Sequence, residues 1–92
     1  MKKIFKYNLE IQEEQTLFLP KNSIIISLGL QNGSARIWAM VEDTESELIP
    51  HVFYIFGTGH PIPDNIIQCP FLGTLIDDAN GLVWHVYLDF GI

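Results

Sequence analysis

Apolar and polar residues alternate along the first segment of the chain. In residues 4–11 every second position is apolar, and these positions are Phe5, Tyr7, Leu9 and Ile11. This alternation is typical of a strand with one buried face. The polar residues 12–15 predict a turn, and a short strand over residues 16–19 is expected to stop at Pro20, which has no N–H for a sheet ladder.

A β-hairpin is the best-defined prediction. Residues 23–31 and 34–42 flank Asn32-Gly33, a dipeptide suited to a type I′ turn because both of its central residues need positive φ. The two-residue turn predicts eight cross-strand pairs: Gln31 with Ser34, Leu30 with Ala35, Gly29 with Arg36, Leu28 with Ile37, Ser27 with Trp38, Ile26 with Ala39, Ile25 with Met40 and Ile24 with Val41. Alternate pairs are wholly apolar and are expected to face the core, namely Leu30 with Ala35, Leu28 with Ile37, Ile26 with Ala39 and Ile24 with Val41.

The second half of the chain also consists of short strand-like segments. In order, the sequence predicts a strand at 51–56, a loop at 57–65, strand segments at 66–69 and 71–76, a turn at 77–81 and a strand at 82–90. In the last strand the expected apolar side consists of Leu82, Trp84, Val86, Leu88 and Phe90. Six to seven short strands predict a mainly all-β fold, either a small antiparallel sandwich or a partly open barrel, with one short helix allowed at 12–15 or 60–67.

Length and composition add expectations about organisation and assembly. Residues 1–92 are expected to form a single domain, since domains typically hold about 100–150 residues. A chain of this size buries only about 60–65% of its unfolded surface, so its core is thin. Hydrophobic residues make up 48% of the chain, and we expect a homo-oligomer in which a second copy covers part of this apolar surplus.

Charge and cysteine content exclude several classes of protein. The net charge is −6, which disfavours nucleic acid as the main partner, although Lys2, Lys3 and Lys6 leave room for a local basic patch. No apolar run approaches the roughly 18 residues needed to span a membrane, and the N-terminal segment alternates instead of forming a signal peptide. Cys69 is the one cysteine and has no internal disulfide partner. These features indicate a cytosolic protein.

Residues 57–64 contain the first candidate for ligand binding. Gly57 and Gly59 permit unusual backbone torsions, and successive N–H groups in such a turn bind anions, with Thr58 and His60 as further donors. The functional interpretation is therefore a phosphate or nucleotide contact. The alternative is a rigid structural loop, because short glycine-rich motifs discriminate poorly between the two.

The predicted hairpin carries the second candidate. Arg36 and Trp38 lie two residues apart on one face, opposite the small residues Gly29 and Ser27, and together they suit a nucleobase and its phosphate. The alternative is that Trp38 covers Gly29 or packs against a second chain.

No motif for catalysis or metal binding is visible. The histidines His51, His60 and His85 show no ligand spacing, so neither a metal nor a cofactor is expected. His85 and Asp89 share a strand face but lie about 13 Å apart, too far for a catalytic pair. We therefore expect a protein that is not an enzyme, with a small hydrolase using His60 or His85 as a remaining alternative.

Several segments together resemble a family of uncharacterised small proteins from bacteriophages and prophages. The most specific segments are Gly57-Thr58-Gly59-His60-Pro61-Ile62-Pro63 and Val83-Trp84-His85-Val86. The family is a domain of unknown function, so no catalytic residue is carried over. The resemblance implies a phage accessory protein that acts in the cytoplasm of the host bacterium.

These observations lead to one main functional hypothesis and its competitors. The main hypothesis is a non-enzymatic counter-defence protein that sequesters a nucleotide-type signal of host immunity. Its candidate ligand-binding residues are Arg36, Trp38, Gly57, Thr58, Gly59, His60 and His85. The runner-up is a protein-interaction module that inhibits a host or phage protein directly.

Overall fold

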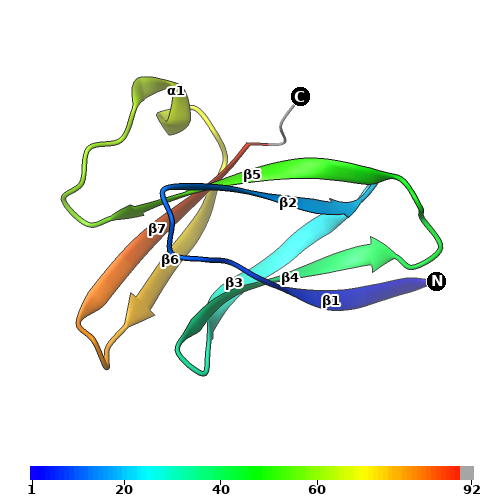
Figure 1. The fold of residues 1–92 in the computed structure, drawn as a ribbon, viewed down its shortest axis with the longest axis horizontal. Coiled ribbons are helices and arrows are strands. Elements are labelled where there is room, and N and C mark those ends of the chain that lie inside the picture. Colours follow the sequence, from blue (N-terminus) through cyan, green and yellow to red (C-terminus); the bar gives the residue numbers. More distant parts are fainter. Residues whose placement is uncertain (90–92) are drawn as a thin grey trace.

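The computed structural model describes residues 1–89, which contain seven strands and one short helix (Figure 1). The elements in chain order are β1 (Lys2–Asn8), β2 (Glu14–Pro20), β3 (Ile24–Gln31), β4 (Ser34–Glu42), β5 (Leu48–Gly57), α1 (Asp64–Ile67), β6 (Phe71–Asp77) and β7 (Leu82–Asp89). The predicted mainly all-β class with one short helix is confirmed. Phe90, which the sequence places at the end of the last strand, lies outside the described residues.

The strands form two antiparallel sheets. Sheet A has the order β1-β4-β3 and sheet B the order β2-β5-β7-β6. The two sheets pack face to face (Figure 1). Of the two predicted architectures, the fold is therefore the sandwich and not the partly open barrel. The Cα atoms extend only 16 Å along the shortest axis, the thickness expected of two layers packed about 10 Å apart.

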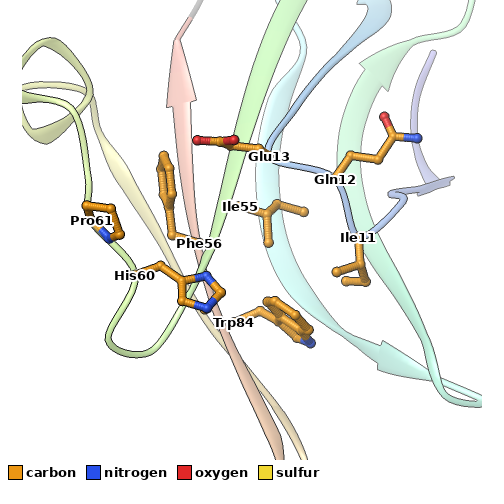
Figure 2. Close-up of a pocket in the computed structure, with 9 residues that line it drawn as sticks. Ile11, Gln12, Glu13, Ile55, Phe56, His60, Pro61 and Trp84 are labelled. Carbon is orange, nitrogen blue, oxygen red and sulfur yellow. The ribbon is translucent and has the colours of Figure 1, made fainter.

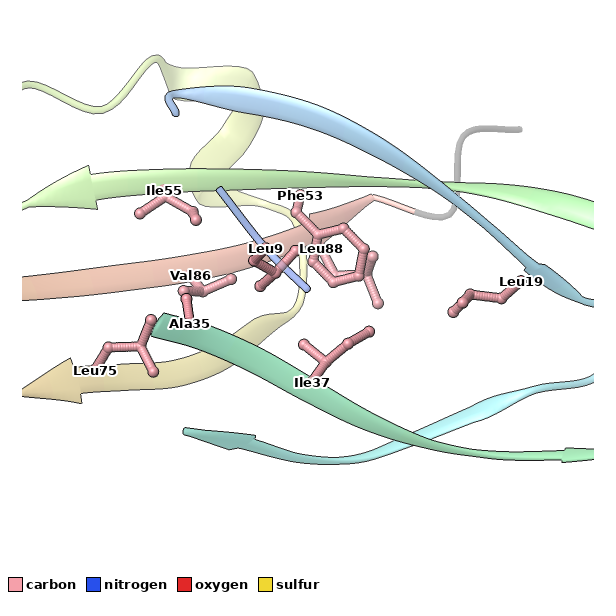
Figure 3. Packing of buried hydrophobic residues seen from close by; sticks show 9 residues of the cluster. All are labelled: Leu9, Leu19, Ala35, Ile37, Phe53, Ile55, Leu75, Val86 and Leu88. Atoms are coloured by element: carbon pink, nitrogen blue, oxygen red, sulfur yellow. The ribbon is translucent and has the colours of Figure 1, made fainter. Parts of the chain in front are cut away.

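Apolar side chains from the facing sides of both sheets make the core. Ile37 of sheet A and Phe53 and Val86 of sheet B have no exposed surface (Figure 3). The remaining buried members of this cluster are Leu9, Leu19, Ala35, Ile55, Leu75 and Leu88. The apolar alternation predicted for the last strand is confirmed at Val86 and Leu88, which are both buried.

The hairpin forms as predicted near its turn but not at its far end. Asn32 and Gly33 have φ of 53° and 78°, as a type I′ turn requires, and the predicted pairs hold from Gln31 with Ser34 as far as Ser27 with Trp38. A β-bulge then interrupts the ladder between Ile25 and Ser27. Beyond the bulge Ile25 lies opposite Ala39 and Ile24 opposite Met40, so the three predicted pairs Ile26 with Ala39, Ile25 with Met40 and Ile24 with Val41 are wrong.

The bulge also changes which isoleucines are buried. One extra residue moves the side chains of β3 on the side of the bulge away from the turn, at residues 24 and 25, to the opposite face. Ile25 therefore packs against the core, whereas Ile24 and Ile26 are 58% and 45% exposed, contrary to the prediction that both face the core. Their predicted partners Ala39 and Val41 on β4 are buried as expected.

A second correction concerns residues 66–69, which the sequence predicts as a strand. They overlap α1 and the turn after it, and α1 lies within residues 60–67, where the sequence allows one short helix. The carbonyl of Pro63 accepts the N–H groups of Ile66 and Ile67 at 2.9 and 3.3 Å, which starts the helical turn. Ile66 is buried, so the segment is held by local hydrogen bonds and one buried side chain and not by strand pairing.

Truncation of Ile37 is expected to be far more damaging than truncation of an exposed isoleucine. Ile37→Ala should lower the free energy of unfolding by about 2–5 kcal/mol, because a fully buried side chain leaves a cavity. The control Ile76→Ala removes the same atoms from a side chain that is 59% exposed and should change stability by at most about 0.5 kcal/mol. Urea denaturation of both variants measures the difference, and equal losses would contradict the sandwich core described above.

Candidate functional site

The chain folds back on itself where β5 ends. Gly57 is the last residue of the strand, and its carbonyl accepts the N–H of His60 at 3.1 Å. The N–H of Thr58 reaches the carbonyl of Val83 on the neighbouring strand β7 at 3.4 Å. Gly59 has a φ of 89°, which only glycine adopts readily, so the second glycine of the segment makes this tight turn possible. We call this segment the 57–60 turn.

Gly57 has a different role from Gly59. It lies directly opposite Trp84 in the β5–β7 ladder. A Cβ atom on Gly57 would lie 2.9 Å from Cε1 of His60 and 3.3 Å from Cζ3 of Trp84. The missing side chain therefore lets both rings lie against the backbone of β5.

His85 lies on the other face of sheet B, where two threonines hold its ring. Nε2 is 2.8 Å from Oγ1 of Thr58, and Nδ1 is 3.1 Å from Oγ1 of Thr74, its direct cross-strand neighbour. Since a hydroxyl both donates and accepts, either neutral tautomer of His85 satisfies both hydrogen bonds. The imidazole thus ties the 57–60 turn to the β6–β7 hairpin.

Two adjoining cavities flank the rings of His60 and Trp84, and Figure 2 shows the residues that line the larger one. The larger has a volume of about 370 Å³ and lies between the β1–β2 connection and the 57–60 turn. Its lining residues are Ile11, Gln12, Glu13, Ile55, Phe56, Gly57, His60, Pro61 and Trp84. The smaller, of about 210 Å³, is lined by Gly57, Thr58, His60, Gly81, Leu82, Val83 and Trp84. We call the two together the Trp84 cleft, because Gly57, His60 and Trp84 line both.

The chemistry of the cleft favours a flat ligand with little negative charge. Its walls combine the rings of His60 and Trp84 with the amide of Gln12 and the carboxylate of Glu13. Neither a lysine nor an arginine is among the described residues that line it, and the carboxylate of Glu13 is the formally charged side chain of its walls. A phosphate placed next to Glu13 would meet a repulsive charge.

The structure separates the candidate residues into two groups. Gly57, Thr58 and His60 line the cleft, Gly59 shapes its turn, and His85 braces it through Thr58. The prediction of a loop at 57–65 could not reveal Trp84 as a lining residue, because Trp84 lies on another strand. Its signal is its place opposite Gly57, which appears only when β5 and β7 are paired.

Arg36 and Trp38 form the second group and lie on sheet A. They alternate along β4 with the buried Ala35 and Ile37, so their side chains lie on the face turned away from sheet B. Neither lines the Trp84 cleft. Cζ3 of Trp38 is 3.7 Å from the Cβ position of Gly29, which is the covering contact considered from the sequence. Within a single copy of the chain, Arg36 and the 57–60 turn therefore do not form one site.

The three histidines have separate surroundings. His51 is buried, and its Nδ1 donates to the carbonyl of Ile49 at 2.9 Å, whereas His60 lies on the turn and His85 between two threonines. In residues 1–89 no group of three or more His, Cys, Asp or Glu side chains is arranged to hold a metal ion. The same stretch contains no helix of the length and hydropathy needed to cross a membrane.

Comparison with known proteins gives one family match. A family model described as "Domain of unknown function (DUF7352)" matches residues 1–90. No curated protein and no solved structure matches the chain. The function is therefore inferred from the chain's own geometry.

Addition of a methyl group at Gly57 is expected to disturb the cleft. Gly57→Ala should lower the free energy of unfolding by about 1–3 kcal/mol, because the new Cβ overlaps the ring of His60. The loss should shrink when His60 is also replaced, so a double-mutant cycle of Gly57→Ala and His60→Ala in urea measures the coupling. Strictly additive effects would show that the two residues do not pack together.

Proposed function

The chain belongs to the DUF7352 family, and we propose that it is a non-enzymatic binding protein whose Trp84 cleft holds the planar base of a nucleotide-type ligand. The observation that carries this proposal is the shared aromatic wall made by His60 and Trp84 over Gly57. The larger cavity, at about 370 Å³, falls within the size range of small-molecule sites.

Stacking on an aromatic ring supplies the main part of the binding energy in this proposal. Stacking of one base on one aromatic side chain contributes about 1–3 kcal/mol in nucleic-acid-binding proteins. Gln12 and Glu13 lie on the β1–β2 side of the same cavity (Figure 2). An amide and a carboxylate suit the donor and acceptor groups on the edge of a base, and the Gln12 amide, which is turned away from the rings of His60 and Trp84, has to rotate to reach one.

The phosphate end of the ligand is placed on the other side of His60. The smaller cavity is lined by Thr58 and Gly81 and not by Glu13, so a phosphate there avoids the nearest carboxylate of the cleft. In the 57–60 turn the N–H groups of Thr58 and His60 already donate to carbonyls, so the donors proposed for a phosphate are the N–H of Gly59 and the ring of His60. With so few donors, the cleft suits a ligand with few phosphates.

The biological setting of the proposal follows from the resemblance to bacteriophage and prophage proteins. A phage accessory protein that binds without catalysis removes its ligand by sequestration in the host cytoplasm. A nucleotide-type signal of host immunity is a ligand of the required chemistry, which makes counter-defence the proposed role. Binding of a host or phage protein is the competing role.

A hydrolase is the second candidate function, and one distance favours it. Oγ1 of Thr58 lies 2.8 Å from Nε2 of His85, the separation of a nucleophile and its general base. Thr74, however, occupies the position on Nδ1 that a carboxylate holds in a catalytic triad, and a hydroxyl carries no charge to stabilise an imidazolium. We therefore assign the three side chains a bracing role.

The two tryptophans allow the ligand site to be located by fluorescence. In Trp38→Phe the only tryptophan is Trp84, and in Trp84→Phe the only one is Trp38. Titration with cyclic nucleotides and ADP-ribose derivatives should quench Trp38→Phe as strongly as wild type. Trp84→Phe should show no ligand-dependent change in the fluorescence of Trp38, because that ring lies on sheet A.

Each alternative predicts a different result in this experiment. A response confined to Trp38 would move the site to Arg36 and sheet A. No response and no heat of binding from any ligand would favour the protein-interaction role. Ligand turnover that is lost in Thr58→Val and retained in Thr58→Ser would establish the hydrolase.

A further inference from the structure

The charged residues of the chain are divided unequally between the two sheets. Four of the five lysine and arginine residues lie in the strands of sheet A, namely Lys2, Lys3, Lys6 and Arg36. The same strands contain one acidic residue, Glu42. The strands of sheet B contain neither lysine nor arginine, and their acidic residues are Glu14, Asp77 and Asp89. The sandwich therefore has one basic and one acidic layer.

The outer face of sheet A combines Lys2, Lys6 and Arg36 with apolar side chains, whereas Lys3 lies in the row of the buried Val41 and is paired with Asp43. The strand register places Ile4, Met40 and Ile24 in one row across the sheet and Lys6, Trp38 and Ser27 in the next. Ile4 and Ile24 are 55% and 58% exposed. The amine of Lys6 donates to Oε1 of Gln31 at 2.7 Å, which leaves its charge without an acidic partner in that contact.

The outer face of sheet B combines aromatic side chains with carboxylates. Phe18 and Phe71 are 60% and 53% exposed, and Phe71 packs edge-to-face on Tyr87 with ring centroids 5.1 Å apart. Tyr87 lies opposite Tyr54, which in turn lies opposite Glu14. Burial raises the pKa of Tyr54, and the negative charges of Glu14 and Asp89 raise it further, as expected on an acidic face.

From this complementarity we propose that the outer face of sheet A binds the outer face of sheet B of a second copy of the chain. Lys6 and Arg36 then meet the carboxylates of sheet B, while the exposed apolar side chains of both faces are buried. Pairing of sheet A with itself would bring the same cations together, which opposite faces avoid. Aligned packing of twisted sheets face to face is a common arrangement.

The symmetry of the contact follows from the fold. The two outer faces lie on opposite sides of the sandwich, so a subunit that uses one face still presents the other. Such head-to-tail contacts extend from copy to copy and do not close as a two-fold dimer. Association should therefore grow with protein concentration beyond the dimer.

Charge reversal on either face tests this arrangement. Lys6→Glu blocks the sheet A face and Glu14→Lys blocks the sheet B face, and sedimentation should show each variant associating at least about tenfold more weakly than wild type. Matched controls make the same charge changes in turns, and they are Lys21→Glu and Asp78→Lys. Both controls should associate as wild type does.

A mixture of the two blocked variants gives the decisive result. Lys6→Glu retains an intact sheet B face and Glu14→Lys an intact sheet A face, so the mixture should associate more strongly than either variant alone. A wild type that stays at 10.5 kDa up to its highest soluble concentration would overturn the proposal. So would a mixture without association, or loss of association in only one of the two variants.

Discussion

The antiparallel register between β5 and β7 is the constraint on which both the core and the candidate site depend. This register places Phe53 opposite Leu88 and Ile55 opposite Val86, and all four side chains are buried. Two residues further along, the same ladder places Gly57 opposite Trp84. A slip of one residue would expose the core side chains and separate the rings of the cleft at the same time. The register that builds the core therefore also sets the geometry of the cleft.

Local sequence signals predicted the parts of the fold that depend on neighbouring residues. Asn32-Gly33 defines its own turn, and the first five pairs of the hairpin follow from it. The bulge near Ile26 has no such signal, because three consecutive isoleucines fit either face of a strand. The strand expected over residues 66–69 is wrong for a similar reason, since a short apolar segment without periodicity suits a helix turn equally well.

The candidate site shows the same limit of local information. The glycines and His60 could be singled out from the sequence because an unusual turn has an unusual composition. Trp84 could not, since it lies 27 residues after Gly57 and looks like any apolar residue of an alternating strand. For Arg36, the alternation along β4 predicts the correct face of the strand. The position of that face relative to the 57–60 turn depends on how the two sheets pack, which the alternation does not predict.

The β-bulge near Ile26 has a consequence for solubility. β3 is an edge strand of sheet A and contains the segment Ile24-Ile25-Ile26-Ser27-Leu28, an uncharged, β-branched sequence of the kind that forms amyloid. A regular strand of this composition would present a continuous row of backbone donors and acceptors as a template for another chain. The bulge interrupts that row and increases the local twist, as natural edge strands commonly do. The irregularity that defeats the simple register is thus also a feature by which natural edge strands avoid pairing with other chains.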